Sequence, residues 1–169
     1  FINLLTDSLP AIAIGMEPAR RGLLDQKPRD PKEPILSRDL LTRIGGQGLL
    51  IAIVTMIAFY LGYQGGDAVL ASTMAFATLT LSQLFHAFDV RSEEASLFHI
   101  GVCSNPAMNR AFLIGLAMQL AVLCLPPLRA VFGTAALTPA QWGAVWALAL
   151  TPVAVCEAVK AAARRRRRS

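Results

Sequence analysis

Long apolar stretches dominate this sequence and limit what it can fold into. Four of them cover about residues 40–63, 68–88, 107–125 and 139–162. Each is close to the roughly 20 residues that a helix needs to cross the hydrocarbon core of a bilayer. A fifth stretch, residues 1–16, is shorter and begins at Phe1 inside an apolar run. We therefore predict an all-α fold, a transmembrane helical bundle of about five spans with the first truncated at Phe1. It forms one membrane domain over residues 1–169.

The composition favours a membrane protein over a soluble domain. Only 16% of the residues are charged and the mean hydropathy is +0.51, whereas soluble domains carry about 25% charged residues. The formal net charge of +5 does not predict a nucleic-acid partner, because five of the sixteen basic residues form the run at residues 164–168. Basic clusters beside apolar spans are typical of topology signals or of contacts with anionic lipid.

Charge differences between the loops predict the orientation of the bundle. Residues 17–39 are rich in basic residues and proline, which indicates a cytoplasmic loop by the positive-inside rule. The turn at residues 64–67 and the loop at residues 129–136 carry at most one basic residue each and are predicted to lie outside. On this pattern the chain is a multi-pass protein whose first span runs inward and whose C-terminus is cytoplasmic.

Several helix starts are marked by capping residues. Ser37 is a predicted N-cap of the second span, and Asn105 before a proline is a predicted N-cap of the fourth. Thr138 and Gln141 stand in the order of a capping box before the last span. Three glycines near the start of the second span are predicted to let another helix approach closely; they are Gly45, Gly46 and Gly48.

Polar residues within the first apolar segment indicate a functional site. The sequence NLLTDSLP at residues 3–10 places an amide, a hydroxyl and a carboxylate just before Pro10. On a helix, positions 3, 6, 7 and 10 share one face, and Pro10 deprives the carbonyl of Thr6 of its hydrogen-bond donor. Exposed backbone oxygen beside Asn3 and Asp7 suits a hard cation such as Ca²⁺. The same pattern also allows Asp7 to be the N-cap of residues 8–15, with an ordinary proline kink after it.

These segments resemble the P-type calcium-transporting ATPases. NLLTDSLPA at residues 3–11 and IGMEP at residues 14–18 look like the sixth transmembrane helix of that family. RDPKEPIL at residues 29–36 looks like its loop between the sixth and seventh helices. The order of the later spans also fits, so the resemblance covers essentially the whole chain. It implies the C-terminal transmembrane region, from the sixth to the tenth helix, of a pump that exports Ca²⁺ from the cytosol across the plasma (inner) membrane.

The resemblance also implies which residues bind the ion. Asn3, Thr6 and Asp7 match the calcium ligands of the sixth helix. Gln83 falls where the two-site reticular pumps carry a glutamate and the plasma-membrane type a glutamine, so it is a weaker candidate ligand. The neutral amide implies one calcium per cycle. Because a Thr, Ser, Gln and His-rich third span is also expected from polar packing between helices, Gln83 is the residue of that span that we single out.

The resemblance further implies partners and cofactors outside this sequence. ATP and Mg²⁺ would act in cytoplasmic catalytic domains, since the sequence contains no Asp-Lys-Thr-Gly phosphorylation motif and should be inactive alone. The expected partners are the lipid bilayer, upstream transmembrane helices and those catalytic domains of the same chain, which the loop at residues 17–39 would touch. No nucleic-acid partner is expected.

Three alternatives stay open. The chain could be a non-catalytic membrane bundle or anchor from a truncated relative. It could belong to a pump of the same family for another cation such as Mn²⁺, which shares oxygen ligands with Ca²⁺; sodium–potassium-type relatives carry an acidic residue at the position of Asn3. A secondary transporter is disfavoured because the sequence shows no internal repeat.

Overall fold

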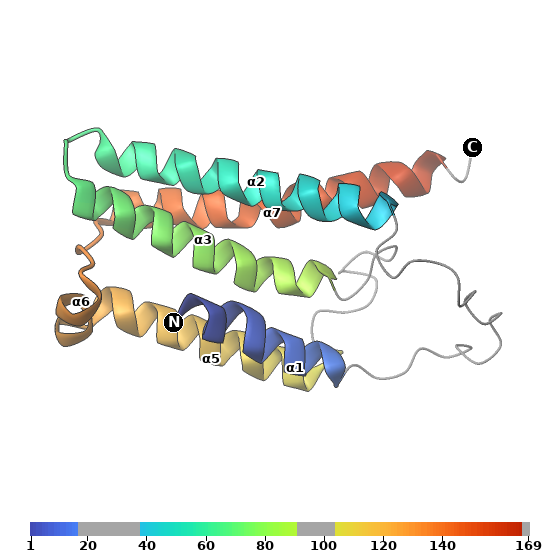
Figure 1. Ribbon diagram of the computed structural model, residues 1–169, viewed down its shortest axis with the longest axis horizontal. Coiled ribbons are helices and arrows are strands. Elements are labelled where there is room, and N and C mark those ends of the chain that lie inside the picture. Colours follow the sequence, from blue (N-terminus) through green and yellow to red (C-terminus); the bar gives the residue numbers. More distant parts are fainter. Residues whose placement is uncertain (17–37, 91–103, 167–169) are drawn as a thin grey trace.

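The protein is a bundle of helices that lie nearly side by side (Figure 1). The computed structural model describes residues 1–16, 38–90 and 104–166. The elements in chain order are a π-helix at Leu4–Ser8, α1 (Leu9–Gly15), α2 (Arg38–Tyr63), α3 (Ala68–Val90), α5 (Pro106–Cys124), α6 (Pro126–Phe132) and α7 (Pro139–Arg166). No strand occurs among the described residues. The predicted all-α fold class is confirmed.

Four of these helices are long and apolar enough to cross a membrane. The segments concerned are Leu40–Tyr63, Ala68–Phe88, Pro106–Cys124 and Pro139–Ala163. The π-helix and α1 together form a shorter, fifth apolar element, as expected for a first span that begins inside its apolar run. The predicted cytoplasmic loop at residues 17–39 lies outside the described residues up to residue 37, and its last two residues already belong to α2.

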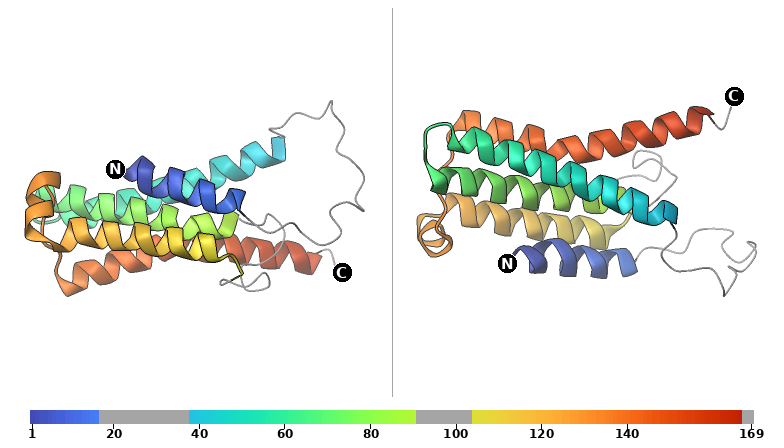
Figure 2. Two further views of the ribbon diagram at one scale, coloured as in Figure 1. Left: turned by 90° about the horizontal axis from the view of Figure 1, so that it is seen from below. Right: turned by 45° about the horizontal axis from the view of Figure 1, so that its top comes forward.

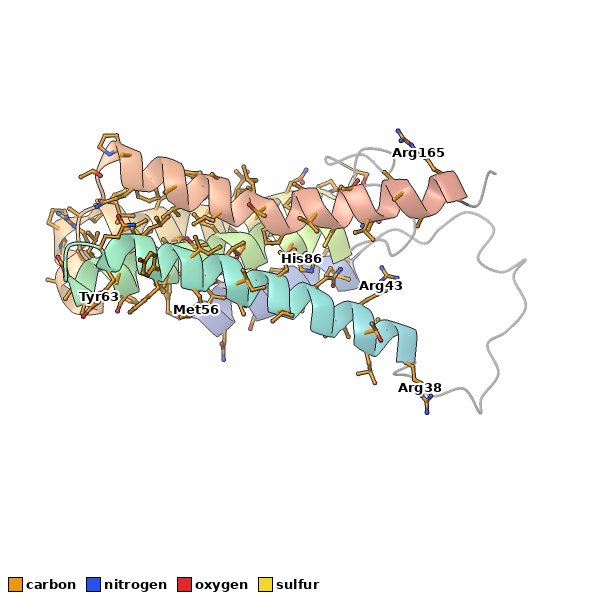
Figure 3. The ribbon with its side chains drawn as sticks, turned by 90° about the horizontal axis from the view of Figure 1, so that it is seen from above. Arg38, Arg43, Met56, Tyr63, His86 and Arg165 are labelled. Carbon is orange, nitrogen blue, oxygen red and sulfur yellow. The ribbon has the colours of Figure 1, made fainter. Side chains whose placement is uncertain are left out.

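Helix α3 is the centre of the bundle. It packs against α2, α7, α5 and the π-helix, whereas α1 packs along α5. Met74 and Leu81 of α3 are buried against Ala58 of α2 and Val145 of α7. The outer helices expose apolar side chains such as Met56, which is 64% exposed (Figure 3). An apolar inner core with an apolar outer surface is the arrangement expected of helices surrounded by lipid.

The two ends of the bundle are unlike. Figure 2 shows the end of α1, the start of α2 and the end of α7 together at one end. The α2–α3 turn and α6 lie at the other end (Figure 1). Arg38, Arg43, Lys160 and Arg165 all belong to the first end, because they stand near the start of α2 or the end of α7. This separation of charge agrees with the predicted orientation, which itself stays a prediction.

Two of the predicted helix starts are confirmed. The Asn105 side-chain oxygen accepts hydrogen bonds from the backbone N–H groups of Ala107 (2.9 Å) and Met108 (3.1 Å) at the start of α5. At the start of α7, the backbone N–H of Thr138 donates to Gln141 Oε1 (2.8 Å) and that of Gln141 donates to Thr138 Oγ1 (3.4 Å). This is the reciprocal pattern of a capping box. Ser37 lies outside the described residues.

The predicted outside loop at residues 129–136 is partly wrong, because its first residues form the end of α6. The prolines that end α5 also begin this short helix, since proline is well tolerated in the first turn. Gly133 then ends α6 with a positive φ of 62°, a conformation in which a glycine is favoured. The backbone N–H of Ala135 donates to the Thr73 hydroxyl (2.9 Å), which ties this connection to α3.

The close approach of two helices occurs at a different glycine from those predicted. A Cβ atom at Gly45, Gly46 or Gly48 would meet nothing within 4 Å, so no described helix approaches there. At Gly62, a Cβ would lie 2.7 Å from the Cα of Ala71. The missing side chain therefore lets α2 and α3 touch backbone to backbone near their connecting turn.

Gly62→Ala should therefore destabilise the protein, whereas Gly45→Ala should not. The added methyl group at Gly62 collides with backbone rather than with a movable side chain, so we expect a loss of about 1–3 kcal/mol in the free energy of unfolding. At Gly45 the methyl group enters open space and helix propensity improves by up to about 1 kcal/mol. Unfolding of the two purified full-length variants by detergent titration measures the difference. Equal stabilities would show that α2 and α3 do not touch at Gly62.

Candidate functional site: a broken helix beside a polar cavity

The first apolar segment is a helix with an interruption before Pro10. Residues Leu4–Ser8 form a π-helix that continues into α1 without leaving helical backbone angles, since Ser8 has φ −69° and ψ −51°. The loosening predicted from Pro10 is thus confirmed. Proline cannot donate a backbone hydrogen bond, and π turns, which bond to the fifth residue along, often occur at functional sites.

Asp7 lies inside the π-helix. The chain is already helical on both sides of it, and α1 follows directly, so Asp7 does not occupy the N-cap position of a helix at residues 8–15. The alternative in which Asp7 is only an N-cap is therefore wrong at the level of the backbone. The side chains of Thr6 and Asp7 lie outside the described part of the structure.

The π turn changes which residues share a face. Asn3 is exposed, whereas Pro10 is buried, although a regular helix would place positions 3 and 10 on one face. One extra residue in the turn rotates everything after it by roughly 100° relative to a regular helix. The expectation of a single face for positions 3, 6, 7 and 10 is therefore wrong for Asn3 and Pro10.

Most polar side chains of α3 are satisfied within their own helix. The hydroxyls of Thr73, Thr80 and Ser82 donate to the backbone carbonyl four residues earlier, at 2.7, 2.9 and 2.6 Å. These bonds explain why hydroxyl residues are tolerated in an apolar span. Gln83 is different, because its Oε1 atom is buried and has no hydrogen-bond partner in the described part of the protein.

Gln83 opens onto a cavity between three helices. The cavity has a volume of about 410 Å³. Pro10 and Ala11 line it from α1, Gln47 from α2, and Gln83 and His86 from α3. Figure 3 labels His86, on the part of α3 that α2 passes. The candidate ligand Gln83 therefore lies in the same cavity as the proline that follows the broken turn, with three polar side chains around mostly apolar walls.

Asn105 holds the end of the broken helix in place. Besides capping α5, its side-chain nitrogen donates a hydrogen bond of 2.9 Å to the backbone carbonyl of Ala13 in α1. Asn105 and Ala13 are both buried, at 1% and 2% exposed. The carbonyls of the last turn of a helix lack partners within that helix, so this amide supplies one and fixes α1 against α5.

Not all of the predicted ligands are brought together by the described structure. It places Gln83 beside Pro10 and Ala11, while Asn3 stands exposed at the far side of the π turn. Within residues 1–16, 38–90 and 104–166 there is no group of three His, Cys, Asp or Glu residues that could hold a metal ion. The assignment of Asn3, Thr6, Asp7 and Gln83 as ligands therefore stays a proposal.

Two residues of this region were not predicted to contribute. Gln47 lines the cavity and also donates a hydrogen bond of 3.6 Å to the sulfur of Cys156 in α7. Its only signal in the sequence is an amide inside a glycine-rich part of an apolar span. Asn105 was recognised as a cap, but nothing near it in the sequence indicates its bond to α1.

Comparison with known proteins identifies the family. The sequence matches the family described as "Cation transporting ATPase, C-terminus" over residues 1–162. It is 38% identical over 179 aligned positions to "Calcium-transporting ATPase 1" of Bacillus cereus, covering 96% of this chain and 20% of that protein. It is 39% identical over 154 positions to "Calcium-transporting ATPase" of Bacillus subtilis, covering 90% of this chain and 17% of that protein.

A human relative shows a similar match. "Calcium-transporting ATPase type 2C member 1" of Homo sapiens is 33% identical over 141 positions, which cover 82% of this chain and 15% of that protein. The chain thus spans about a fifth or less of the length of these relatives. The matched family, the four membrane-length helices and the broken first helix agree with one another. The chain belongs to the cation-transporting ATPases, and it is their C-terminal membrane region.

Proposed function

We propose that this chain is the ion-binding membrane portion of an ATP-driven calcium pump. The observation that carries the proposal is the π-helix at Leu4–Ser8, because it interrupts an apolar helix at the segment that holds a carboxylate, an amide and a hydroxyl. An interrupted helix in a membrane leaves backbone oxygen without its usual donor. Such oxygen, together with the side chains of Asn3, Thr6 and Asp7, is what Ca²⁺ prefers. The names of the relatives, which are calcium-transporting ATPases, support the choice of ion.

The proposed ligands have separate roles. Asp7 supplies the negative charge, and Asn3 and Thr6 supply neutral oxygens that replace water around the ion. Gln83, whose Oε1 atom is buried without a partner, supplies a further neutral oxygen at the cavity. Ca²⁺ takes about six to eight oxygen ligands, so the four residues cannot complete its shell. We place the remaining ligands on upstream helices of the same polypeptide, with ATP and Mg²⁺ acting in its cytoplasmic domains.

The orientation follows from the charges at the two ends of the bundle. The end that carries Arg38, Arg43 and Arg165 is proposed to face the cytoplasm of a plasma (inner) membrane, by the positive-inside rule. The C-terminus lies at this end (Figure 1). Ca²⁺ would then reach Asp7 from the cytosol and leave on the opposite side.

The proposal is tested by ATP-driven uptake into inside-out vesicles that contain the complete polypeptide. We expect uptake of radioactive Ca²⁺ that needs ATP and Mg²⁺ and is released by a calcium ionophore. Competition with Mn²⁺ in the same vesicles examines the other cation for which this ligand set is suited. Vesicles that show no ATP-dependent uptake of either ion, with the protein inserted and folded, would instead favour a non-catalytic membrane bundle.

The neutral side chain of Gln83 predicts the stoichiometry of the pump. With one carboxylate, Asp7, among the four proposed ligands, we expect a single high-affinity calcium site on this part of the protein, because charge count sets calcium affinity. The measurement is equilibrium binding of radioactive Ca²⁺ to the purified full-length protein, divided by the phosphoenzyme formed from ATP. The expected ratio is about one. A ratio of two would place another charged site on the pump.

A further inference from the structure

A groove between α2 and α7 combines positive charge with an apolar wall. It has a volume of about 320 Å³. Arg43 and Lys160 line one part of it, and Leu50, Val155 and Val159 line the apolar part. The two valines are 41% and 63% exposed. This groove is distinct from the cavity at Gln83, which lies between α1, α2 and α3.

The helices at this groove are held together beneath it. The Gln47 amide of α2 donates to the Cys156 sulfur of α7 at 3.6 Å, and both residues line the groove. Gly46 lines it as well, and a Cβ there would meet nothing within 4 Å. The space next to Gly46 is therefore part of a groove that the missing side chain keeps open.

The charges around the groove leave an excess of positive charge. Lys160 is only 8% exposed and lies 3.5 Å from the carboxylate of Glu157, one turn earlier on α7. That pair is neutral overall, so Arg43 adds one uncompensated positive charge. Figure 3 shows Arg43 on the side of α2 toward α7, whereas Arg38 and Arg165 point outward at the same end.

We propose that this groove binds an anionic phospholipid of the surrounding bilayer. Its headgroup phosphate would lie between Arg43 and Lys160, and an acyl chain would lie along Gly46, Val155 and Val159. A phospholipid has the same order of parts as the groove, with a negative group at the membrane surface and hydrocarbon below it. Basic pockets between transmembrane helices at a membrane surface are suited to such headgroups. A peptide helix would cover the valines but would leave the excess charge of Arg43 without a counter-ion.

Retention of phosphatidylglycerol by the complete polypeptide tests this site. The protein is placed in phosphatidylcholine nanodiscs with a small fraction of phosphatidylglycerol, released from them, and examined by native mass spectrometry. Each basic residue near a membrane surface contributes about a fivefold preference for anionic lipid. We therefore expect Arg43→Gln with Lys160→Gln to lower retention by roughly 30-fold. Arg38→Gln, at the same end but pointing away, should leave retention unchanged.

A second pair of variants tests the apolar part without changing charge. Gly46→Leu fills the groove and should reduce retention of phosphatidylglycerol, whereas Gly45→Leu, next to it but outside the groove, should not. Millimolar inorganic phosphate should fail to displace the lipid. The proposal is overturned if wild type retains no phosphatidylglycerol, if Arg38→Gln lowers retention as much as the double variant, if Gly46→Leu has no effect, or if phosphate alone displaces the lipid. None of these outcomes depends on which ion is pumped.

Discussion

Asp7→Asn should abolish calcium activation of ATP hydrolysis by the complete polypeptide at micromolar calcium. The substitution keeps the size of the side chain but removes the one negative charge among the proposed ligands Asn3, Thr6, Asp7 and Gln83. Even residues that only orient a metal ligand change metal affinity by about 10- to 100-fold. Loss of a charged ligand should therefore weaken the apparent calcium affinity by on the order of 100-fold or more.

The matched control is Ser8→Ala. Ser8 is the exposed neighbour of Asp7 in the same π-helix and makes no side-chain cap bond. Calcium titration of ATPase activity in membranes should give the wild-type midpoint for Ser8→Ala and a strongly raised midpoint for Asp7→Asn. Equal midpoints for the two variants, with equal amounts of folded protein, would remove Asp7 from the transport site and leave the π-helix without a role in binding.

Asn105→Ala should be the most destabilising single substitution at a helix start in this protein. It removes a cap, which costs about 1 kcal/mol. It also leaves the buried carbonyl of Ala13 without its donor, at a cost of about 1–3 kcal/mol. We therefore expect a loss of about 2–4 kcal/mol in the free energy of unfolding. Detergent-induced unfolding of the full-length protein is the measurement.

Two comparisons separate the cap from the link to α1. Thr138→Ala removes a cap of α7 that has no bond to another long helix, and it should cost only about 1 kcal/mol. Asn105→Asp retains the capping oxygen and loses the amide donor to Ala13, so it should weaken calcium affinity through the position of α1. If Asn105→Ala costs no more than Thr138→Ala, the hydrogen bond to α1 contributes nothing to stability.

Local sequence was sufficient for features that depend on near neighbours. Pro10 disturbs the helix a few residues before it, and the caps at Asn105 and Thr138 bond to residues two or three positions away. The membrane-length helices follow in the same way from runs of apolar residues. α6 was missed although its signals are local, because two prolines were taken only as the end of α5 and not as the start of another helix.

The candidate site depends on contacts that no local pattern contains. Asn105 and Ala13 are 92 positions apart, and Gln47 and Cys156 are 109 apart. The π turn rotates Asn3 away from Pro10, which the regular spacing of a helix does not predict. Which glycine admits a neighbouring helix was decided by the turn that pairs α2 with α3, and this turn selects Gly62.

The sequence by itself determined the class of the protein, its family and the segment that breaks before Pro10. Hydrophobicity, proline and capping act through the residue itself and its nearest neighbours, so they can be read in one dimension. Only the tertiary structure decided that Gln83 shares a cavity with α1, and that Arg43 and Lys160 face one groove. Cavities and grooves form where the surfaces of distant helices fail to fill the space between them, and that depends on how all of the helices pack together.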